Sequence, residues 1–484
     1  MRVIRPALLS LLPLTGLFAA TATASMASAE DFAPCADSAE HALLAGSRCA
    51  HFEVPLYHDQ AASDRTLTLF VRRYDAEGEA RGQIWFLAGG PGEAGASYYP
   101  AIDFFRSEFS EYDLIIPDHR GTGYSAKLCE PEETAESEGG LALAGAEWGS
   151  CFGQLYGDLE RAHAFNSFQA AHDLDALRAA NRGNGEQFIY AVSYGTGLAL
   201  QHAAITHQPL DGIILDSLVA HAGHADADLS RRSAITDRIG TVLIERCAAA
   251  AACPLGEDAL AQYQSVLSRI DAGEDLPGME QVPGGNLRQL LGLMLDIPAA
   301  RARIPAIIHA LSEESDTAGP LITEAIAETE SLFAPFSELP QGTASIPLVA
   351  MMAGSESNGR PGLTADTVAA EQLSYRFTSP LAGFLADTQF PLYERPPLAV
   401  ADTLPPVLVL QGTLDPKTPY EAALEHVQTW QTQNPVAILT LNDAPHAAYL
   451  TAQDCLAGPL SRFVSAPEEV QNETCGPSAS ALPF

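Results

Sequence analysis

Short apolar runs bounded by turn residues alternate along this chain with segments whose apolar residues recur at helical spacing. From about residue 50, apolar runs that favour strands occupy residues 51–59, 65–76, 82–90, 112–123, 186–193, 210–217, 405–416 and 436–446. Helical patterns over 167–181 and 194–208 lie between some of these runs. This alternation predicts an α/β fold, with a mostly parallel sheet and helices on both of its faces.

The pattern changes between residues 218 and 400, where helical segments rich in Ala, Leu and Glu are broken by Pro and Gly. No convincing series of strands occurs there, and the strand pattern resumes at Pro405. A chain of 484 residues is also longer than one compact core usually holds. We therefore expect an α/β core formed by residues 30–217 and 401–484, with a helical cap domain inserted over residues 218–400.

The first 29 residues have the pattern of a secretory signal peptide. Arg2 and Arg5 precede an apolar stretch that is too short and too interrupted to span a membrane stably, and a small-x-small cleavage site ends at Ala29. We expect residues 1–29 to be removed and the chain to be secreted or periplasmic. No later apolar run approaches the roughly 18 residues of a membrane helix, so stable membrane insertion is not expected.

The formal net charge of −35 excludes some partners. A surface this acidic repels nucleic acid and anionic membranes, and it attracts cations, including the free amino terminus of a peptide. Solubility outside the cell explains the same charge.

The eight cysteines form four pairs that are close in sequence: 35 with 49, 129 with 151, 247 with 253, and 455 with 475. Close pairs in an exported protein usually become disulfides, although eight cysteines formally permit 105 pairings. The sequence has no CxxC motif and no His-rich cluster, so it indicates no metal site.

Ser193 stands between an apolar strand pattern and a helical pattern, within AVSYG. A strand-Ser-helix turn in an open α/β sheet presents a hydroxyl beyond the end of the strand and requires small residues two positions away on each side. Gly195 fits this requirement, and Ala191 replaces the usual first Gly. A tight structural turn explains these small residues equally well, so the assignment of a nucleophile depends on its partners.

A reactive serine needs a base within reach and an acid that orients the base. Asp415 follows one late strand and His446 follows the next, in the order serine, acid, histidine that this fold uses. Asp216 and Asp443 are alternative acids, and an ordinary loop histidine is the alternative for His446. We expect Ser193, Asp415 and His446 to form a catalytic triad.

An oxyanion intermediate also needs two backbone donors. We expect one donor to be the N–H of Tyr194 and the other to be that of Gly90, because Pro91 has none. The glycine-rich loop lacks the endings of nucleotide-binding loops. Asp118 and Arg120 in the next glycine-rich turn are expected to support the floor of the site, and His119 is a weaker candidate for an accessory role.

Five motifs occur in the order of one known family and extend over most of the chain: GGPGEAG, DHRGTGYSAKLC, VSYGTGLAL, GTLDPKTP and DAPHAAY. On these motifs the chain resembles the proline iminopeptidase and tripeptidyl aminopeptidase group of α/β-hydrolase serine peptidases. CAHFEVPLYHD, RCAAAAACP and the closing segment with Cys455 and Cys475 extend the resemblance, the last of these to the tripeptidyl type.

The resemblance implies an α/β-hydrolase fold and the same roles for the nucleophile, acid, base and oxyanion donors. It also implies that the helical insertion covers the site and selects substrates. In this family acidic cap residues can bind the free amino group of the substrate, which makes Glu356 in AMMAGSESNGR a candidate for substrate binding. A solvated loop carboxylate is the other interpretation of Glu356.

The chain departs from the family pattern at four positions: Ala88 where His often stands, His119 where Gln is frequent, and Ala191 and Pro445 where Gly is common. These departures leave the reaction class unchanged and bear on the choice of substrate.

We therefore predict an exported serine hydrolase that needs no cofactor and acts as an aminopeptidase, releasing residues or short peptides from the free N-terminus through an acyl-enzyme. One alternative is a carboxylester or lactone hydrolase with the same triad, because the fold does not fix the leaving group. Another is a non-catalytic binding protein. The expected partner is a small peptide or ester, and the sequence does not predict an oligomeric state.

Overall fold

The computed structural model describes residues 32–59, 64–183, 185–398, 401, 403–430, 432–476 and 480–484. The signal peptide predicted at residues 1–29 lies outside these ranges. Among the helices that the structure describes, none has the length and apolarity needed to cross a membrane.

Ten strands form one sheet in the order β1-β2-β3-β5-β4-β6-β7-β8-β9-β10. The strands β1 to β3 are antiparallel to their neighbours, and the strands from β5 to β10 in this order run parallel. Their bounds are β1 Ala33–Pro34, β2 Arg48–Pro55, β3 Thr66–Tyr74, β4 Gly82–Leu87, β5 Tyr112–Asp118, β6 Glu186–Val192, β7 Gly212–Asp216, β8 Val407–Gly412, β9 Val436–Leu441 and β10 Glu473–Cys475.

The parallel centre of the sheet is buried on both faces. Every residue of β4, β5, β7 and β8 is buried, which is why these segments read as continuous apolar runs in the sequence. Alternate residues serve opposite faces: Trp85 packs on one side and Phe86 on the other. The predicted α/β architecture is confirmed.

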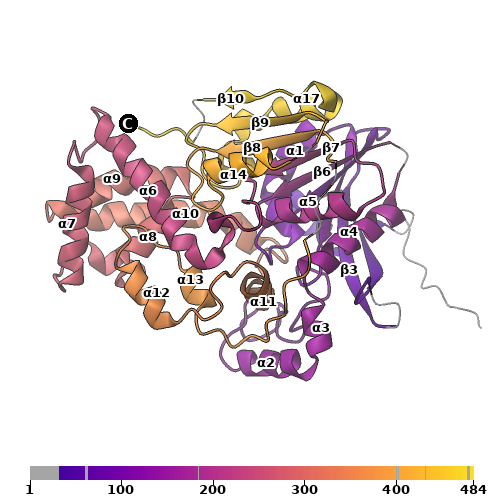
Figure 1. Cartoon of the computed structure of the whole chain (residues 1–484), viewed down its shortest axis with the longest axis horizontal. Helices are drawn as coiled ribbons and strands as arrows, with labels where there is room; N and C mark the ends of the chain where they lie inside the picture. The colour runs from indigo at the N-terminus through magenta and orange to yellow at the C-terminus, as the bar shows by residue number, and fades with distance from the viewer. Residues whose placement is uncertain are drawn as a thin grey trace, which may run out of the picture.

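Helices cover both faces of the sheet (Figure 1). Apolar residues of α4, α5 and α14 pack on one face, and those of α1 and α15 to α17 pack on the other. Their bounds are α1 Ile102–Glu108, α4 Ser167–Asn181, α5 Tyr194–Ile205, α14 Tyr420–Gln428, α15 Ala448–Thr451, α16 Gln453–Leu456 and α17 Pro459–Ser465.

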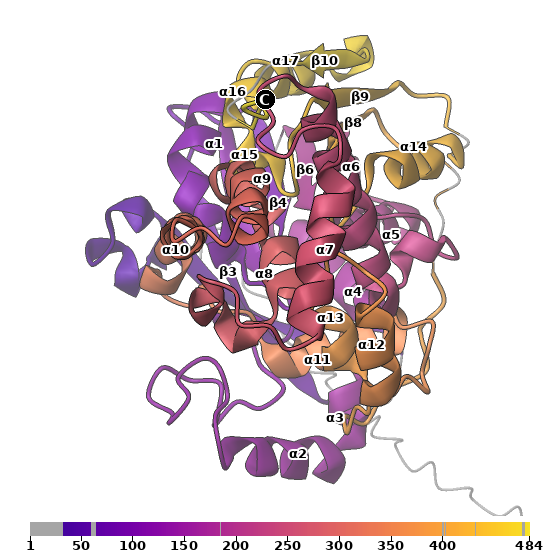
Figure 2. The ribbon, with the colours of Figure 1, turned by 90° about the vertical axis from the view of Figure 1, so that its left-hand side faces the viewer.

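In the described part of the chain between β7 and β8, every regular element is a helix. Helices α6 to α10, within residues 232–338 and here called the cap, share an apolar core and lie beside the sheet, in front of it in Figure 2. The helix α11 packs Leu348, Met351 and Met352 into the core of the sheet instead. The bounds are α6 Arg232–Ala249, α7 Ala259–Asp271, α8 Leu287–Met294, α9 Pro298–Ser312, α10 Ala318–Glu338, α11 Ile346–Glu356, α12 Ala365–Gln372 and α13 Leu381–Leu385.

Short 3₁₀ helices complete the chain: η2 Ala36–Ala39, η3 Ala42–Leu44, η4 Gly95–Ala101, η5 Ala225–Ala227, η6 Leu229–Arg231, η7 Met279–Gln281, η8 Pro283–Gly285 and η9 Pro467–Glu469.

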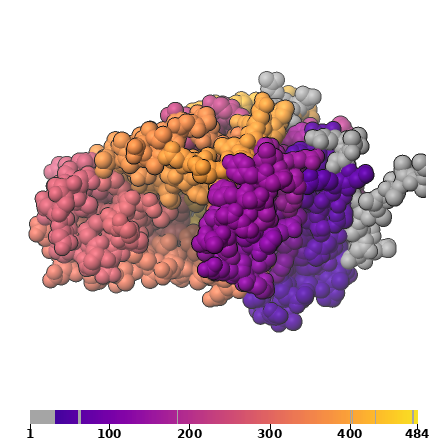
Figure 3. Space-filling model, turned by 90° about the horizontal axis from the view of Figure 1, so that it is seen from below, coloured from indigo at the N-terminus to yellow at the C-terminus, as the bar shows by residue number. Residues whose placement is uncertain are grey.

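A second excursion, between β5 and α4, contains α2 (Glu147–Gly157) and α3 (Leu159–His163). Seen from below, the orange segment after α11 extends from the cap onto the purple surface of this excursion (Figure 3). Phe152 and Phe390 form part of that contact, with ring centroids 5.0 Å apart. Two distant parts of the chain therefore close one side of the molecule together.

The four predicted disulfides are confirmed as Cys35–Cys49, Cys129–Cys151, Cys247–Cys253 and Cys455–Cys475. Each closes a loop of 6 to 22 residues within one region of the fold. The pairs therefore fasten local segments, and none joins the cap core to the sheet.

Arg120 and Asp118 make buried contacts next to the sheet, and their expected place at the floor of the site stays a prediction. The guanidinium of Arg120 is 1% exposed and donates to both oxygens of Asp173, at 2.6 and 2.7 Å, and to the carbonyls of Leu56 and Ala164. Asp118 accepts from the backbone of Gly95 and Tyr124, while its burial raises its pKa to about 6.

Replacing Arg120 by methionine should lower the free energy of unfolding by about 3 kcal/mol, because Asp173 then keeps a buried charge without its main partner. Urea denaturation of the purified protein measures this change. The matched change of Arg81, whose pair with Glu186 is partly exposed, should cost about 1 kcal/mol or less. Equal losses in the two variants would contradict the structural role of Arg120.

Candidate active site

Ser193 occupies the sharp turn between β6 and α5. Its backbone angles are φ 54° and ψ −123°, a region that residues other than glycine rarely adopt, and its N–H donates to the carbonyl of Asp216 at 3.0 Å. The half-buried side chain lines a cavity. A strained serine at the end of a parallel strand is the geometry of a nucleophile in α/β enzymes.

Close backbone contacts explain the small residues around this turn. A Cβ atom on Gly195 would lie 2.4 Å from the carbonyl oxygen of Leu87, so that position requires glycine. Ala191 is fully buried within β6, and its methyl group is accommodated in the core. The loop after β4 is equally close, since a Cβ on Gly89 would lie 3.2 Å from that of Ser193.

Asp415 follows β8 and is completely buried. Its Oδ1 accepts from the backbone of Lys417 and Thr418 at 2.8 and 2.7 Å, and its Oδ2 accepts from the Thr418 hydroxyl at 2.7 Å and contacts His446 Nδ1 at 2.8 Å. Burial alone would raise the pKa of Asp415, but the charge of His446 and these hydrogen bonds lower it. The site therefore holds an ionised acid.

His446 follows β9 and is 8% exposed. Its Nδ1 faces Asp415, while Nε2 makes no hydrogen bond within the part of the chain that the structure describes. The same holds for a contact with the nucleophile: no hydrogen bond between described residues joins Ser193 Oγ to His446. The structure thus brings the predicted acid and base together, and Ser193 follows β6, which β7 separates from β8 in the sheet.

The alternative acids have other partners. Both oxygens of Asp216 accept from the start of α15, at Ala448 and Tyr449, and also from the hydroxyls of Tyr190 and Ser217. Asp443 pairs with Arg246 of the cap. Neither carboxylate contacts His446 among the described hydrogen bonds. Asp216 instead anchors the helix that follows the histidine.

The two predicted oxyanion donors border the same cavity as Ser193. Gly90 has φ 104°, which favours glycine, and Tyr194 is the first residue of α5. Neither N–H donates to another residue in the described part of the structure. The assignment of Gly90 and Tyr194 as the oxyanion donors stays a prediction.

His119 has no partner among the described residues that would make it an acid or a base for this site. Burial lowers its pKa to about 4, so the ring is neutral near pH 7. Its Nδ1 lies 3.1 Å from the carbonyl of Arg120, and its Nε2 is buried without a partner in the same part of the chain.

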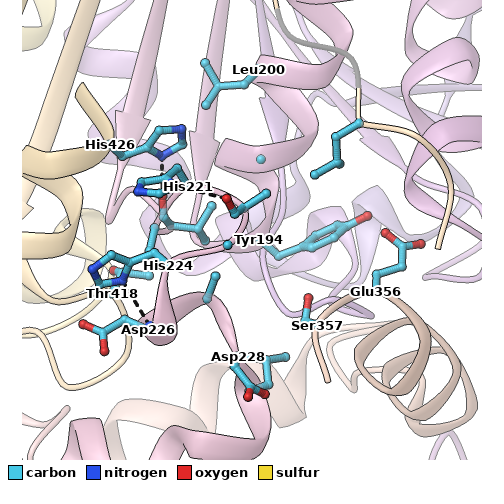
Figure 4. A pocket seen from close by; sticks show the side chains of 18 of the residues that line it. Tyr194, Leu200, His221, His224, Asp226, Asp228, Glu356, Ser357, Thr418 and His426 are labelled. Carbon is cyan, nitrogen blue, oxygen red and sulfur yellow. Dashed lines mark hydrogen bonds between the residues drawn. The ribbon is translucent and has the colours of Figure 1, made fainter. Parts of the chain in front are cut away.

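A cavity of about 1220 Å³ lies between the sheet and the cap. Glu356, at the end of α11, is 9% exposed and faces this space beyond the ring of Tyr194 (Figure 4). Its Oε1 accepts from Tyr393 Oη at 2.7 Å and from Ser167 N at 2.9 Å. This burial and the two bonds to Oε1 do not fit a freely solvated loop carboxylate. Oε2 receives no hydrogen bond from any described residue, so one oxygen is left for a ligand.

Two contributors to the site escaped the sequence analysis. Thr418 stands within GTLDPKTP, where a Thr three residues after a buried acid was a usable signal. Tyr393 lies in the connection after the cap helices, and no local pattern links it to Glu356. Among the described residues, no three His, Cys, Asp or Glu side chains are grouped to hold a metal ion.

Comparisons with known proteins agree with this architecture. The model of the alpha/beta hydrolase fold family matches residues 84–284, and the model described as TAP-like protein matches residues 386–475. The chain therefore has an α/β-hydrolase fold with a TAP-like C-terminal segment, and the resemblance predicted from its motifs is confirmed.

The chain is 26% identical over 262 residues to the serine protease Hip1 of Mycobacterium tuberculosis H37Rv, covering 50% of this chain and 49% of that protein. It thus spans about half the length of the curated relatives it matches. A proline iminopeptidase from Mycobacterium smegmatis is 14% identical, with a TM-score of 0.41, over 87% of this chain and 99% of that chain. An esterase from Thermogutta terrifontis has a TM-score of 0.36 at 14% identity, with the same two coverages.

Replacing Thr418 by valine removes one of the hydrogen bonds to ionised Asp415 and should lower the free energy of unfolding at pH 7 by about 1–3 kcal/mol. A carboxyl with a lowered pKa stabilises the fold above its unfolded pKa of about 3.9, and this contribution is lost as the pH falls through its folded pKa. Denaturant titrations at pH 7 and near pH 3 should therefore show a smaller difference at the lower pH.

Thr329→Val is the matched control, because among the described residues that hydroxyl bonds only to the carbonyl of Ala325 in α10. Its effect should not depend on pH. A pH-independent loss in Thr418→Val would contradict its link to the Asp415 carboxylate.

Proposed function

We propose that this chain, whose fold is that of the α/β-hydrolases, is an exported serine aminopeptidase that releases residues or short peptides from the free N-terminus of peptides. The observation that carries the proposal is the pairing of Asp415 with His446 beside a cavity that Ser193 lines and Glu356 faces. His446 contacts Thr418, which lines this cavity together with Ser193, and Glu356 adds a carboxylate that suits an ammonium group.

In the proposed reaction, Ser193 Oγ attacks the carbonyl carbon of the scissile peptide bond as its proton passes to His446 Nε2. The C–N bond then breaks, and the leaving amine takes that proton, which leaves an acyl-enzyme. Water activated by the same nitrogen releases the acyl group. Asp415 stays ionised and holds the imidazole with Nδ1 towards it.

Ser193 Oγ would approach His446 Nε2 when substrate binds. Catalytic hydrogen bonds in unliganded enzymes are often long and shorten in the complex with substrate. The N–H groups of Gly90 and Tyr194, which border the cavity, would receive the oxyanion. Removal of one such donor typically costs about 10²–10³-fold in kcat.

The amino group of the substrate would bind at Glu356. Its Oε1 is held by Tyr393 and Ser167, so the carboxylate is fixed in place before a ligand arrives. The hydroxyl of Tyr194 is buried without a partner among the described residues and lies towards Glu356 in Figure 4. A substrate with a free amine would bring an ammonium group as the partner that Glu356 Oε2 and the Tyr194 hydroxyl lack among the described residues.

Export is supported by the disulfides and by the N-terminal sequence pattern. Four disulfides suit an oxidising compartment and are rare in the cytosol. We propose a secreted or periplasmic location, reached through cleavage of residues 1–29.

Ser193→Ala should lower kcat on a free-amine peptide arylamide by about 10⁶-fold, and Asp415→Asn should lower it by about 10⁴-fold. Asn at 415 would favour the wrong imidazole tautomer. Release of the arylamine measures kcat, and labelling by a fluorophosphonate measures the reactivity of the Ser193 hydroxyl. Asp443→Asn is the control, and its kcat should stay within about tenfold of the wild type, which is about 1.4 kcal/mol of activation free energy. Full activity of Asp415→Asn would reject the proposed triad.

Glu356→Gln should lower kcat/KM for free-amine arylamides by about 10- to 100-fold, because a charged hydrogen bond to the ammonium group is lost. The glutamine keeps a side-chain oxygen that can accept from Tyr393 and Ser167, so the local packing should persist. N-acetylated arylamides and short esters should change less than about threefold, since they bring no ammonium group to this position. Equal turnover of blocked and free substrates by the wild type would favour an esterase or a less selective hydrolase.

A further inference from the structure

The cavity has a basic side as well as an acidic one. Arg232, the first residue of α6, and Lys417, two residues after Asp415, both border it. Lys417 is one of only two lysines in the chain, and the overall charge is −35. Cations placed beside the proposed acid therefore call for a specific explanation.

The guanidinium of Arg232 makes a single hydrogen bond among the described residues, from Nη1 to the carbonyl of Lys417. No carboxylate of the described residues forms an ion pair with it, and its other guanidinium nitrogens have no partner there. Burial lowers its pKa, whereas the charges of Asp415, Asp296 and Asp226 raise it. A guanidinium remains protonated in proteins, so the residue brings a positive charge with unused donors to the cavity.

Several other charges nearby are paired, while Glu93, whose charge acts on Lys417, forms no ion pair among the described residues. Asp226 pairs with Arg238 at 2.5 Å, and Asp228 pairs with Arg231 at 3.1 Å. Lys417 Nζ lies 3.1 Å from Asp296 of the cap. On the acidic side of the cavity, Oε2 of Glu356 has no partner among the described residues. On the basic side, the same is true of the guanidinium nitrogens of Arg232 other than Nη1.

The two charges lie on different sides of the reaction centre. Figure 4 shows Glu356 on one side of Tyr194 and Thr418, the neighbour of Lys417, on the other. The leaving amine must approach the imidazole that protonates it, and that imidazole contacts the loop of Asp415 and Thr418. The leaving part of the substrate therefore lies on the side of Arg232.

We propose that Arg232, assisted by Lys417, binds a carboxylate on the leaving part of the substrate, so that the enzyme favours short peptides with an anionic group close after the cleaved bond. This inference rests on the proposed aminopeptidase function. The carboxylate is either the free C-terminus of a short peptide or the side chain of Asp or Glu. Two adjacent donors of a guanidinium match the two oxygens of such a group.

A purely structural role for Arg232 would need only one of its guanidinium donors. One hydrogen bond to the carbonyl of Lys417 is enough to tie α6 to the acid loop, and lysine or glutamine could supply it. Arg232 borders the cavity, and the other nitrogens of its guanidinium have no partner among the described residues. These donors can bind an anion.

The test uses the full-length protein and substrates with one acyl part that the wild type accepts as an arylamide. The first pair has a dipeptide leaving group that ends in a carboxylate or in an amide. The second pair has a C-terminal amide and carries Asp or Asn after the cleaved bond. Mass spectrometry of the products gives kcat/KM for each member, and the arylamide itself reports activity without any carboxylate.

The wild type should cleave the acid of at least one pair about tenfold faster than its neutral partner, as expected for a charged hydrogen bond. The pair that responds identifies the source of the carboxylate. Arg232→Gln should bring that ratio close to one while arylamide turnover stays within about threefold, because the arylamide carries no anion for a guanidinium to bind. Lys417→Gln should reduce the ratio less, since its charge is already paired with Asp296.

Arg395→Gln is the matched control, because Arg395 also borders the cavity and forms no ion pair with a described residue. Its acid-to-neutral ratio should remain that of the wild type. A wild-type ratio near one in both pairs, or an unchanged ratio in Arg232→Gln, would overturn the inference while arylamide cleavage still supports the aminopeptidase. Failure to cleave free-amine arylamides would instead overturn the proposed function, and this inference with it.

Discussion

The buried carboxylate of Asp415 is the constraint on which the rest of the site depends. A charge without exposed surface is stable only where donors surround it, and here they come from two backbone groups, Thr418 and His446. These bonds hold the loop after β8 against the loop after β9. The orientation of the imidazole is therefore a consequence of satisfying one buried acid, and Asp216 secures the helix that follows it in the same manner.

The cap is joined to the core at these same loops. Arg246 binds Asp443, Arg301 donates to the carbonyls of Asp443 and Ser480, and Lys417 pairs with Asp296. Residues near the C-terminus also pack against the apolar core of α6 to α10. The elements that would select a substrate are thus attached beside the elements that would react with it, so binding and chemistry share one set of supports.

Sequence reasoning succeeded where the physical signal is local. Fully buried strands produce continuous apolar runs, and the eight strands β2 to β9 were all predicted; β1 and β10, of two and three residues, are too short to leave a pattern. The order of Ser193, Asp415 and His446 identified the acid and base that meet. The contact of Tyr393 with Glu356 and the unpaired state of Arg232 among the described residues depend on the packing of distant segments, and no local pattern encodes them.

The late position of the predicted acid and base in the sequence has a consequence for how the site forms during synthesis of the chain. Asp415 and His446 lie in the last part of the 484 residues, whereas Ser193 and the glycine-rich loop precede the cap. Because a polypeptide is synthesised from its N-terminus, the turn of Ser193 leaves the ribosome long before Asp415 and His446 do. The proposed triad can therefore assemble only once β9 has paired with β8, late in the synthesis of the chain.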